Sequence, residues 1–136
     1  MELAGRQRNL VLILARSFAA QLATAVFLVD EHGSVIYFNE AAERLLGQRF
    51  IEGAGMAAED WSTRYRPRDA EGRTVPLESL PLGATMLKRE SAHGIVTILG
   101  ADGVDRRIEV AAFPLFARTE EFVGAIALFW ERPEDR

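Results

Sequence analysis

Hydrophobic residues follow a helical spacing at the start of the chain. Over residues 3–22, Leu3, Leu10, Leu14 and Phe18 recur at intervals that place them on one side of a helix, and the segment contains no proline. The run of Val, Leu and Ile residues between them widens the apolar surface beyond one stripe. The pattern predicts a helix that must cover another surface or pair with a copy of itself.

Two strands and a short helix are predicted next. Residues 24–30 and 34–39 are rich in β-branched and aromatic side chains, and Gly33 lies in the turn between them at a position that favours positive φ. Asn39 is a suitable N-cap for the helix that follows, because its side-chain oxygen can accept from the amides of the first turn. Gly47 is a suitable left-handed C-cap for the same helix.

The middle of the chain is less regular. Residues 48–79 are loop-like apart from one helical turn predicted at 57–61, and a helix with Pro81 in its first turn is expected over 79–90. Three strands joined by short turns then predict an antiparallel meander over 93–100, 106–116 and 122–130.

These strands do not alternate apolar and polar residues. The runs "AVFLV" and "AIALFW" are apolar throughout, so both faces of the antiparallel sheet are expected to be dry. Helices from the middle of the chain can cover one face. The other face requires the N-terminal helix, a partner subunit, or both.

Length and composition indicate one folded domain. The 136 residues divide into an N-terminal helix at 1–22, a domain at 23–131 and a tail at 132–136.

The net charge of −4 argues against nucleic-acid binding, and the absence of cysteine excludes disulfides and thiolate chemistry. The apolar run at 10–15 is too short to span a membrane, and Arg16 interrupts its similarity to a signal peptide. We therefore expect a cytoplasmic protein that does not bind membranes.

Three segments resemble the PAS domain family. The stretch "VDEHGSVIYFNEAAERLLG" is similar to the opening of that family, "EGRTVPLESLPLGATMLKRE" is similar to its central segment, and "RRIEVAAFPLFARTEEFVGAIALFWE" is similar to its closing hairpin. Together they cover roughly residues 20–131 in the expected order. The resemblance implies an α+β fold, with a five-stranded antiparallel sheet that cups short helices.

The same resemblance implies a sensory role. PAS domains sense small molecules or cofactors, and they bind partners or themselves through the outer face of the sheet. Many are followed by a helix that drives an output domain, whereas this sequence stops at "WERPEDR". We expect any output to come from a separate protein, such as a kinase, a cyclase or a transcription regulator.

Cofactor-binding members of the family have residues that this sequence lacks. Flavin-based photoreceptors use a cysteine and inner-face amides, and the positions equivalent to those amides here are Ile98, Ile108 and Phe129. Heme-binding members use a histidine on the helix before the meander, whereas His93 lies just beyond that helix and His32 lies in a turn. We expect no cofactor and no metal.

The alternation of side chains sorts the strands into an inner and an outer face. The inner face is expected to be apolar and to form either a packed core or a pocket for an apolar metabolite. Residues expected on this face are Phe27, Val29, Tyr37, Val96, Ile98, Ile108, Val110, Ala112, Ala125, Ala127 and Phe129. Candidate pocket residues are Trp61, Tyr65, Met86, Ile98, Ile108, Ala112, Ala127 and Phe129.

The outer face is also expected to be apolar. It should carry Val26, Leu28, Ile36, Phe38, Leu99, Ala111, Phe113, Ile126, Leu128 and Trp130. A large exposed apolar surface is an interaction site or an aggregation hazard, so we expect a homodimer with the N-terminal helix in its interface. Candidate interface residues are Leu10, Leu14, Phe18, Leu28, Phe113, Leu128 and Trp130.

Three classes of function fit these patterns. The first is a non-catalytic signalling module that acts by homodimerisation or by binding a separate protein, and the second is a sensor of an apolar small molecule. The third is an enzyme such as an isomerase, which needs a positioned acid or base in its cavity. Because Arg107 and Glu109 are expected on the outer face, the third class has the least support.

Overall fold

The computed structural model describes residues 2–118 and 120–133, and their side chains from Leu10 onward. Both ends of the predicted domain scheme, residues 1 and 134–136, lie outside the described residues, as does Thr119 in the predicted last turn. The elements are α1 (Glu2–Ala20), β1 (Ala25–Asp30), β2 (Val35–Phe38), α2 (Glu40–Leu46), α3 (Ala58–Arg64), the 3₁₀ helix η1 (Leu77–Ser79), α4 (Pro81–Lys88), β3 (Ala92–Leu99), β4 (Asp105–Arg118) and β5 (Glu121–Glu131).

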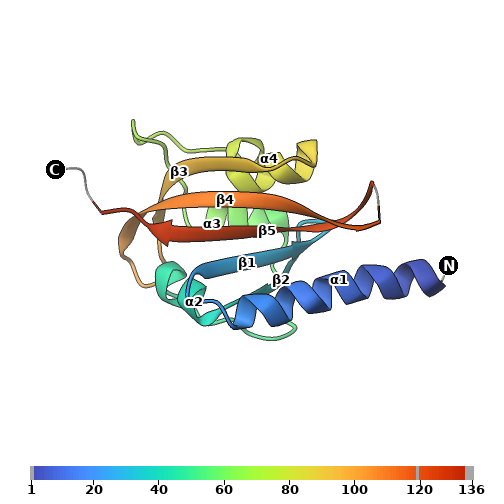
Figure 1. Cartoon of the computed structure of the whole chain (residues 1–136). Helices are drawn as coiled ribbons and strands as arrows, with labels where there is room; N and C mark the ends of the chain where they lie inside the picture. The colour runs from blue at the N-terminus through green and yellow to red at the C-terminus, as the bar shows by residue number, and fades with distance from the viewer. Residues whose placement is uncertain (1, 119, 134–136) are drawn as a thin grey trace.

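The strands form one antiparallel sheet in the order β2-β1-β5-β4-β3. The predicted α+β fold with a five-stranded antiparallel sheet is confirmed. The first and last strands, β1 and β5, are neighbours in the middle of the sheet. Figure 1 shows α1 on one face of the sheet, and α2, α3 and α4 on the other.

The inner face packs against the short helices. Its apolar side chains form one cluster with residues of α2, α3 and α4, including Ala42, Trp61 and Leu82. The predicted inner-face residues Phe27, Val96 and Phe129 are buried in this cluster. Burial of apolar surface on this scale is the main source of stability of the domain.

The outer face is covered by α1 only in part. Ala19 on α1 packs with Val26, Leu28 and Ile126 in a second apolar cluster. α1 contacts β1, β2, β4 and β5, and its N-terminal half extends past the ends of β1 and β2 (Figure 1). The predicted packing of the N-terminal helix on the outer face is confirmed.

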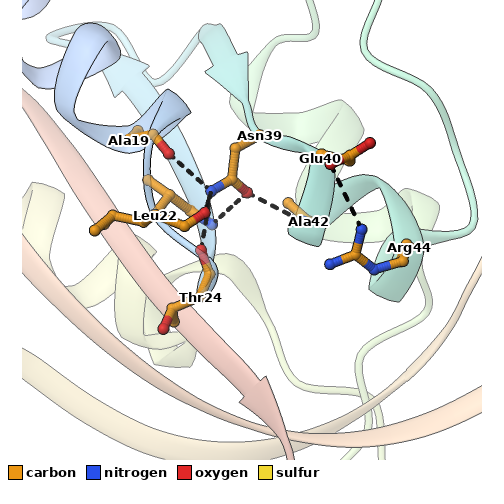
Figure 2. A network of polar contacts seen from close by, with 8 residues as sticks. Ala19, Leu22, Thr24, Asn39, Glu40, Ala42 and Arg44 are labelled. Atoms are coloured by element: carbon orange, nitrogen blue, oxygen red, sulfur yellow. Dashed lines mark hydrogen bonds and ion pairs between the residues drawn. The ribbon is translucent and has the colours of Figure 1, made fainter.

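The caps predicted for the first short helix are present. The Oδ1 atom of Asn39 accepts from the amide of Ala42 at 3.0 Å, and Gly47 closes α2 in the left-handed region at φ 65°. Figure 2 shows that Asn39 also binds the backbone at the end of α1 and the start of β1. α3 is a longer helix than the single turn expected at 57–61.

Two residues of β2 lie on the faces opposite to those predicted. Phe38 pairs with Phe27 and belongs to the inner cluster, whereas Tyr37 pairs with Leu28 and packs on the outer side. The cause is a β-bulge, because Val29 pairs with Val35 and leaves Ile36 as an extra residue in β2. A bulge of one residue reverses the alternation beyond it.

No described helix combines the length and the apolar character that crossing a membrane requires.

Candidate functional site

A small cavity lies between the inner face of the sheet and the helices. Its volume is about 90 Å³. Six of the predicted pocket residues line it: Trp61, Tyr65, Ile98, Ile108, Ala127 and Phe129. The other lining residues, which the sequence patterns did not single out as pocket residues, are Phe27, Leu46, Pro67, Leu80, Pro81, Leu82, Val96 and Val110.

The structure places two predicted pocket residues away from the cavity. Met86 approaches Gly33, where its Cε would lie 3.2 Å from a β-carbon added to the glycine. Ala112 is completely buried, and its carbonyl accepts from the Thr85 hydroxyl at 3.4 Å. α4 packs on β4, and Thr85 of α4 contacts this part of the strand.

Trp61 of α3 and Tyr65, its C-cap residue, line the cavity, but their polar atoms make hydrogen bonds to other parts of the protein. Trp61 Nε1 donates to the Gly33 carbonyl at 2.7 Å, and the Tyr65 hydroxyl donates to Gln48 Oε1 at 2.8 Å. Burial raises the pKa of the Tyr65 phenol, so Tyr65 keeps its proton. The cavity therefore has an apolar wall.

The size of the cavity limits what it can hold. Pockets for drug-sized ligands usually span about 300–1,000 Å³, and one water takes roughly 30 Å³ of the liquid. A cavity of about 90 Å³ lies well below this range and corresponds to the liquid volume of a few water molecules. The inner cluster is thus not fully packed.

His93, which the sequence places just beyond the helix before the meander, does not line the cavity. It pairs with Ala111 in the register of β3 and β4, and its side chain contacts Glu109 on the outer side of the sheet. Glu109 also accepts from Arg132 Nη1 at 2.9 Å, and this hydrogen bond is the main reason why the pKa of the Glu109 carboxyl is lowered. Among the described residues, no group of three His, Asp or Glu side chains could hold a metal ion.

The outer side carries a second candidate site. Leu10, Ile13, Leu14 and Phe18 of α1 are each more than half exposed, although they are large and apolar. Ile95, Phe113 and Trp130 lie on the part of the sheet that α1 leaves uncovered, and each is about 40% exposed. We call the first set the helix stripe and the second set the sheet patch.

The prediction of Leu28 as an interface residue is wrong. Leu28 is 0% exposed, because α1 of the same chain covers it. Leu128 is partly buried against the same cluster. Ile13 and Ile95 were not among the predicted interface residues. Ile13 could have been predicted, because it lies three residues after Leu10 and so shares a side of the helix with it.

The antiparallel sheet, the helices on its inner face and the apolar cavity between them together define a small α+β domain. A family model described as a PAS domain matches residues 14–81, which is half of the chain. The chain belongs to the PAS domain family, whose members are typically sensory or signalling modules.

Solved structures agree with this assignment. The PAS domain of BvgS from Bordetella pertussis has a TM-score of 0.55 and 15% identity, with 90% of this chain and 86% of that chain covered. The PAS domain of nitrogen regulation protein NR(II) from Vibrio parahaemolyticus has a TM-score of 0.54 and 21% identity, and the match covers 88% of this chain and 98% of that chain. A LOV protein from Rhodobacter sphaeroides has a TM-score of 0.67 and 13% identity, and the match covers 95% of this chain and 69% of that chain. At these identities the likeness shows the fold alone. No curated protein matches the sequence.

Proposed function

We propose that this chain is a non-catalytic PAS signalling module that acts as a homodimer. The observation that carries the proposal is that α1 is apolar on two sides. One side packs on the sheet of its own chain through Leu12, Ala15 and Ala19. The opposite side presents the helix stripe to solvent.

A second copy of the chain is the occupant that fits this surface. The helix stripe and the sheet patch both lie on the outer side of the molecule, so a two-fold axis can place each stripe against the patch of the other copy. Such an interface is self-complementary, as isologous dimers require. Burial of these seven side chains would contribute on the order of 10 kcal/mol per protomer before the cost of association.

The proposal does not include catalysis. The cavity has an apolar wall, and an enzyme of the isomerase type needs an acid or a base there. A signalling dimer would act on a separate protein, such as a kinase, a cyclase or a transcription regulator.

The mass of the protein in solution tests the dimer. The wild-type chain is expected at twice the monomer mass by native mass spectrometry or light scattering. Leu14→Glu and Trp130→Glu are each expected to shift it to the monomer, because they place a charge in the buried interface. Leu87→Glu is the matched control, since Leu87 is 69% exposed on α4 and lies in the other layer. A wild-type monomer, or a dimer that survives both substitutions, would rule out this interface.

The cavity supports a second candidate function, a sensor of a small apolar molecule. Its lining has the chemistry to hold such a ligand and no group that would bind a charged one. Native mass spectrometry of the purified protein tests this function, because a co-purifying small mass supports it. A protein that carries no added mass and takes up no benzene speaks against it.

A further inference from the structure

A second hollow lies at the edge of the sheet. It is a cleft of about 700 Å³ between β2, α3 and the segment at residues 48–57, and we call it the edge cleft. Pockets for small ligands usually span about 300–1,000 Å³, so the edge cleft has room for one. Among the described residues, none lines both the edge cleft and the inner cavity. The edge cleft is therefore a separate site.

The segment that forms one wall of the edge cleft is held at both ends. Near its end, the Met56 carbonyl accepts from the Val35 amide of β2 at 2.9 Å. Near its start, the Phe50 amide donates to the Glu43 carboxylate of α2 at 2.8 Å. Bonds to a strand and to a helix fix the position of this wall, so the cleft is formed before any ligand binds.

One arginine of the edge cleft is neutralised by an ion pair. Arg16 of α1 donates to both oxygens of the Glu52 carboxylate, at 2.6 and 3.0 Å. The Arg16 guanidinium carbon also lies 4.6 Å from the ring centre of Tyr37. The charge of this arginine is therefore already compensated within the chain.

Two further arginines of the edge cleft lack such a partner. Arg49 and Arg64 are exposed and line the cleft, and neither makes an ion pair with any described residue. By contrast, six described arginines have a carboxylate oxygen within 3.9 Å: Arg16, Arg44, Arg68, Arg73, Arg106 and Arg132. The cleft thus holds two positive charges that the described carboxylates do not pair.

The two unpaired arginines come from adjacent places in the fold. Burial raises the pKa of the Tyr65 phenol, and the charge of Arg64 opposes this rise, so the Arg64 guanidinium lies near the Tyr65 hydroxyl. That hydroxyl donates to Gln48 Oε1 at 2.8 Å, and Gln48 directly precedes Arg49. Two guanidinium groups on neighbouring segments offer the paired donors that carboxylates and phosphates accept.

The acidic residues of the cleft do not cancel these charges. Asp60 lies one turn before Arg64, but its carboxylate accepts from the Ala57 amide at 3.3 Å, at the start of α3. Glu52 is paired with Arg16. With three arginines against two carboxylates, the described lining of the cleft is net positive, whereas the whole chain carries −4. An anion is the ligand that this charge favours.

Apolar side chains lie beside these charges. Ile36, the extra residue of the β-bulge, lines the edge cleft, as do Ile51 and Met56. Ile51 is 66% exposed, although it is large and apolar. A ligand that covers Ile51 would gain from burial of apolar surface as well as from charge.

We propose that the edge cleft binds an organic anion, in which a carboxylate or phosphate group is attached to a small apolar body. Arg49 and Arg64 hold the oxygens of the anionic group, and Ile36 and Ile51 contact the body. A carboxylate and a phosphate share the chemistry that arginine recognises, so the two are distinguished by experiment. The proposal concerns one chain and does not depend on the homodimer.

Titration of the full chain with three probes tests the site. Phenyl phosphate has both the anionic group and the apolar body, inorganic phosphate has only the anion, and phenol has only the body. Binding is followed by NMR through the backbone amides of Gly53 and Gly55, which line the cleft. Phenyl phosphate should shift these amides, inorganic phosphate should bind about five-fold more weakly, and phenol should leave them unchanged. Benzoate in place of phenyl phosphate then shows which anionic group is preferred.

Substitution of the arginines tests the anionic part of the site. Arg49→Gln and Arg64→Gln should each raise the dissociation constant of phenyl phosphate about ten-fold, because each removes a charge-assisted pair. Arg44→Gln is the matched control, since Arg44 lies on α2 outside the lining of the edge cleft and pairs with Glu40 at 3.9 Å. All three variants lose the same net charge, so a general attraction between protein and anion falls equally in each.

Ile51→Ser tests the apolar part of the site. It should weaken the binding of phenyl phosphate about three-fold and leave that of inorganic phosphate unchanged, because it removes only a contact with the body. Ile51 and the three arginines are exposed, so each variant should melt close to the wild-type temperature and thereby show that it is folded.

Three results would overturn the site. The first is that neither phenyl phosphate nor benzoate shifts the amides of Gly53 and Gly55. The second is an equal weakening in Arg44→Gln and in the two cleft variants, which would mean an adventitious ion only. The third is equal binding of phenyl phosphate and inorganic phosphate, since the apolar lining would then contribute nothing.

Discussion

The side-chain nitrogen of Asn39 donates a hydrogen bond to the carbonyl of Ala19 at 2.9 Å and so joins the start of α2 to the end of α1 (Figure 2). The same nitrogen donates to the Thr24 carbonyl at 2.9 Å. On its other side, Oδ1 accepts from the amides of Ala42 and Val26, each at 3.0 Å. Asn39 is 1% exposed, so these bonds replace the water that its amide would otherwise bind.

Asn39→Asp distinguishes the stabilising effect of the helix cap from that of the hydrogen bonds that the side-chain nitrogen donates. Aspartate is as good an N-cap as asparagine, and it can still accept from Ala42 and Val26. It cannot donate to Ala19 or Thr24, and its second carboxylate oxygen would face their carbonyls. We expect a loss of about 2–4 kcal/mol in the free energy of unfolding, measured with urea. A loss below about 1 kcal/mol would mean that Asn39 acts only as a cap.

Gly83 in α4 should reverse the usual effect of a glycine-to-alanine change. Inside a helix this change normally stabilises by roughly 1 kcal/mol. Here a β-carbon on Gly83 would lie 1.8 Å from the Leu77 carbonyl oxygen, which is backbone and cannot rotate away. We expect Gly83→Ala to destabilise by about 2 kcal/mol or more in thermal or urea unfolding.

Gly94→Ala is the control for the Gly83 experiment. A β-carbon on Gly94 would meet the side chain of Pro81 at 3.3 Å and no backbone atom. Its cost should be clearly smaller than that of Gly83→Ala. Equal costs would show that the close approach of η1 to α4 is not the cause.

Ile98→Ala should enlarge the cavity and open it to a larger apolar probe. Ile98 is 5% exposed and forms part of the cavity wall. The truncation is expected to cost about 2–5 kcal/mol in the free energy of unfolding, since the lost methyl groups leave a larger void. Benzene should then raise the melting temperature of the variant more than that of the wild type.

Ile51→Ala provides the comparison for this prediction. Ile51 is 66% exposed, so its truncation should cost only a few tenths of a kcal/mol and should not change the response to benzene. If benzene does not raise the melting temperature of Ile98→Ala more than that of the wild type, the cavity walls have collapsed into the space left by the truncated side chain.

The turn between β3 and β4 should contribute to stability in a pH-dependent way. Arg106 donates to the Asp102 carboxylate at 2.7 and 3.1 Å, and it also donates to the Leu45 carbonyl at 2.9 Å. These bonds hold the pKa of the Asp102 carboxyl below its usual range. A carboxyl with a depressed folded-state pKa stabilises the fold above its unfolded-state pKa, near 4, and loses this effect as the pH falls through the folded value.

Asp102→Asn should therefore flatten the loss of stability between roughly pH 4 and pH 2, measured by urea unfolding at each pH. Arg106→Gln should flatten it in the same way, because it removes the donor rather than the acceptor. The double variant should resemble either single variant. An unchanged acid slope in Asp102→Asn would show that this pair does not contribute.

Local chemistry made much of this fold predictable. The unit from Asn39 to Gly47 has a cap, an apolar face and a stop within nine residues, so its structure follows from neighbours in sequence. The meander was predictable for the same reason, since short turns leave antiparallel pairing as the simple outcome. The likeness of three segments to the PAS family extended this local information to the whole domain.

Long-range packing limited the prediction of the faces and of the site. The bulge at Ile36 moved Phe38 inward and Tyr37 outward, and nothing in the four residues of β2 marks it. Leu28 became buried because α1 lies over it, which depends on where the helix docks. Glu52, in the segment between α2 and α3, accepts a hydrogen bond from Arg16 of α1, and no spacing pattern indicates a pair that is 36 residues apart.

The central place of β1 and β5 in the sheet has a consequence for biosynthesis. β1 is made early and β5 late, yet each has the other as its neighbour in the middle of the layer. During translation, the hairpin of β1 and β2 is not paired with β5 until β5 leaves the ribosome. The sheet can therefore close only after β5 has left the ribosome, and until then the nascent chain exposes apolar strands that chaperones can bind.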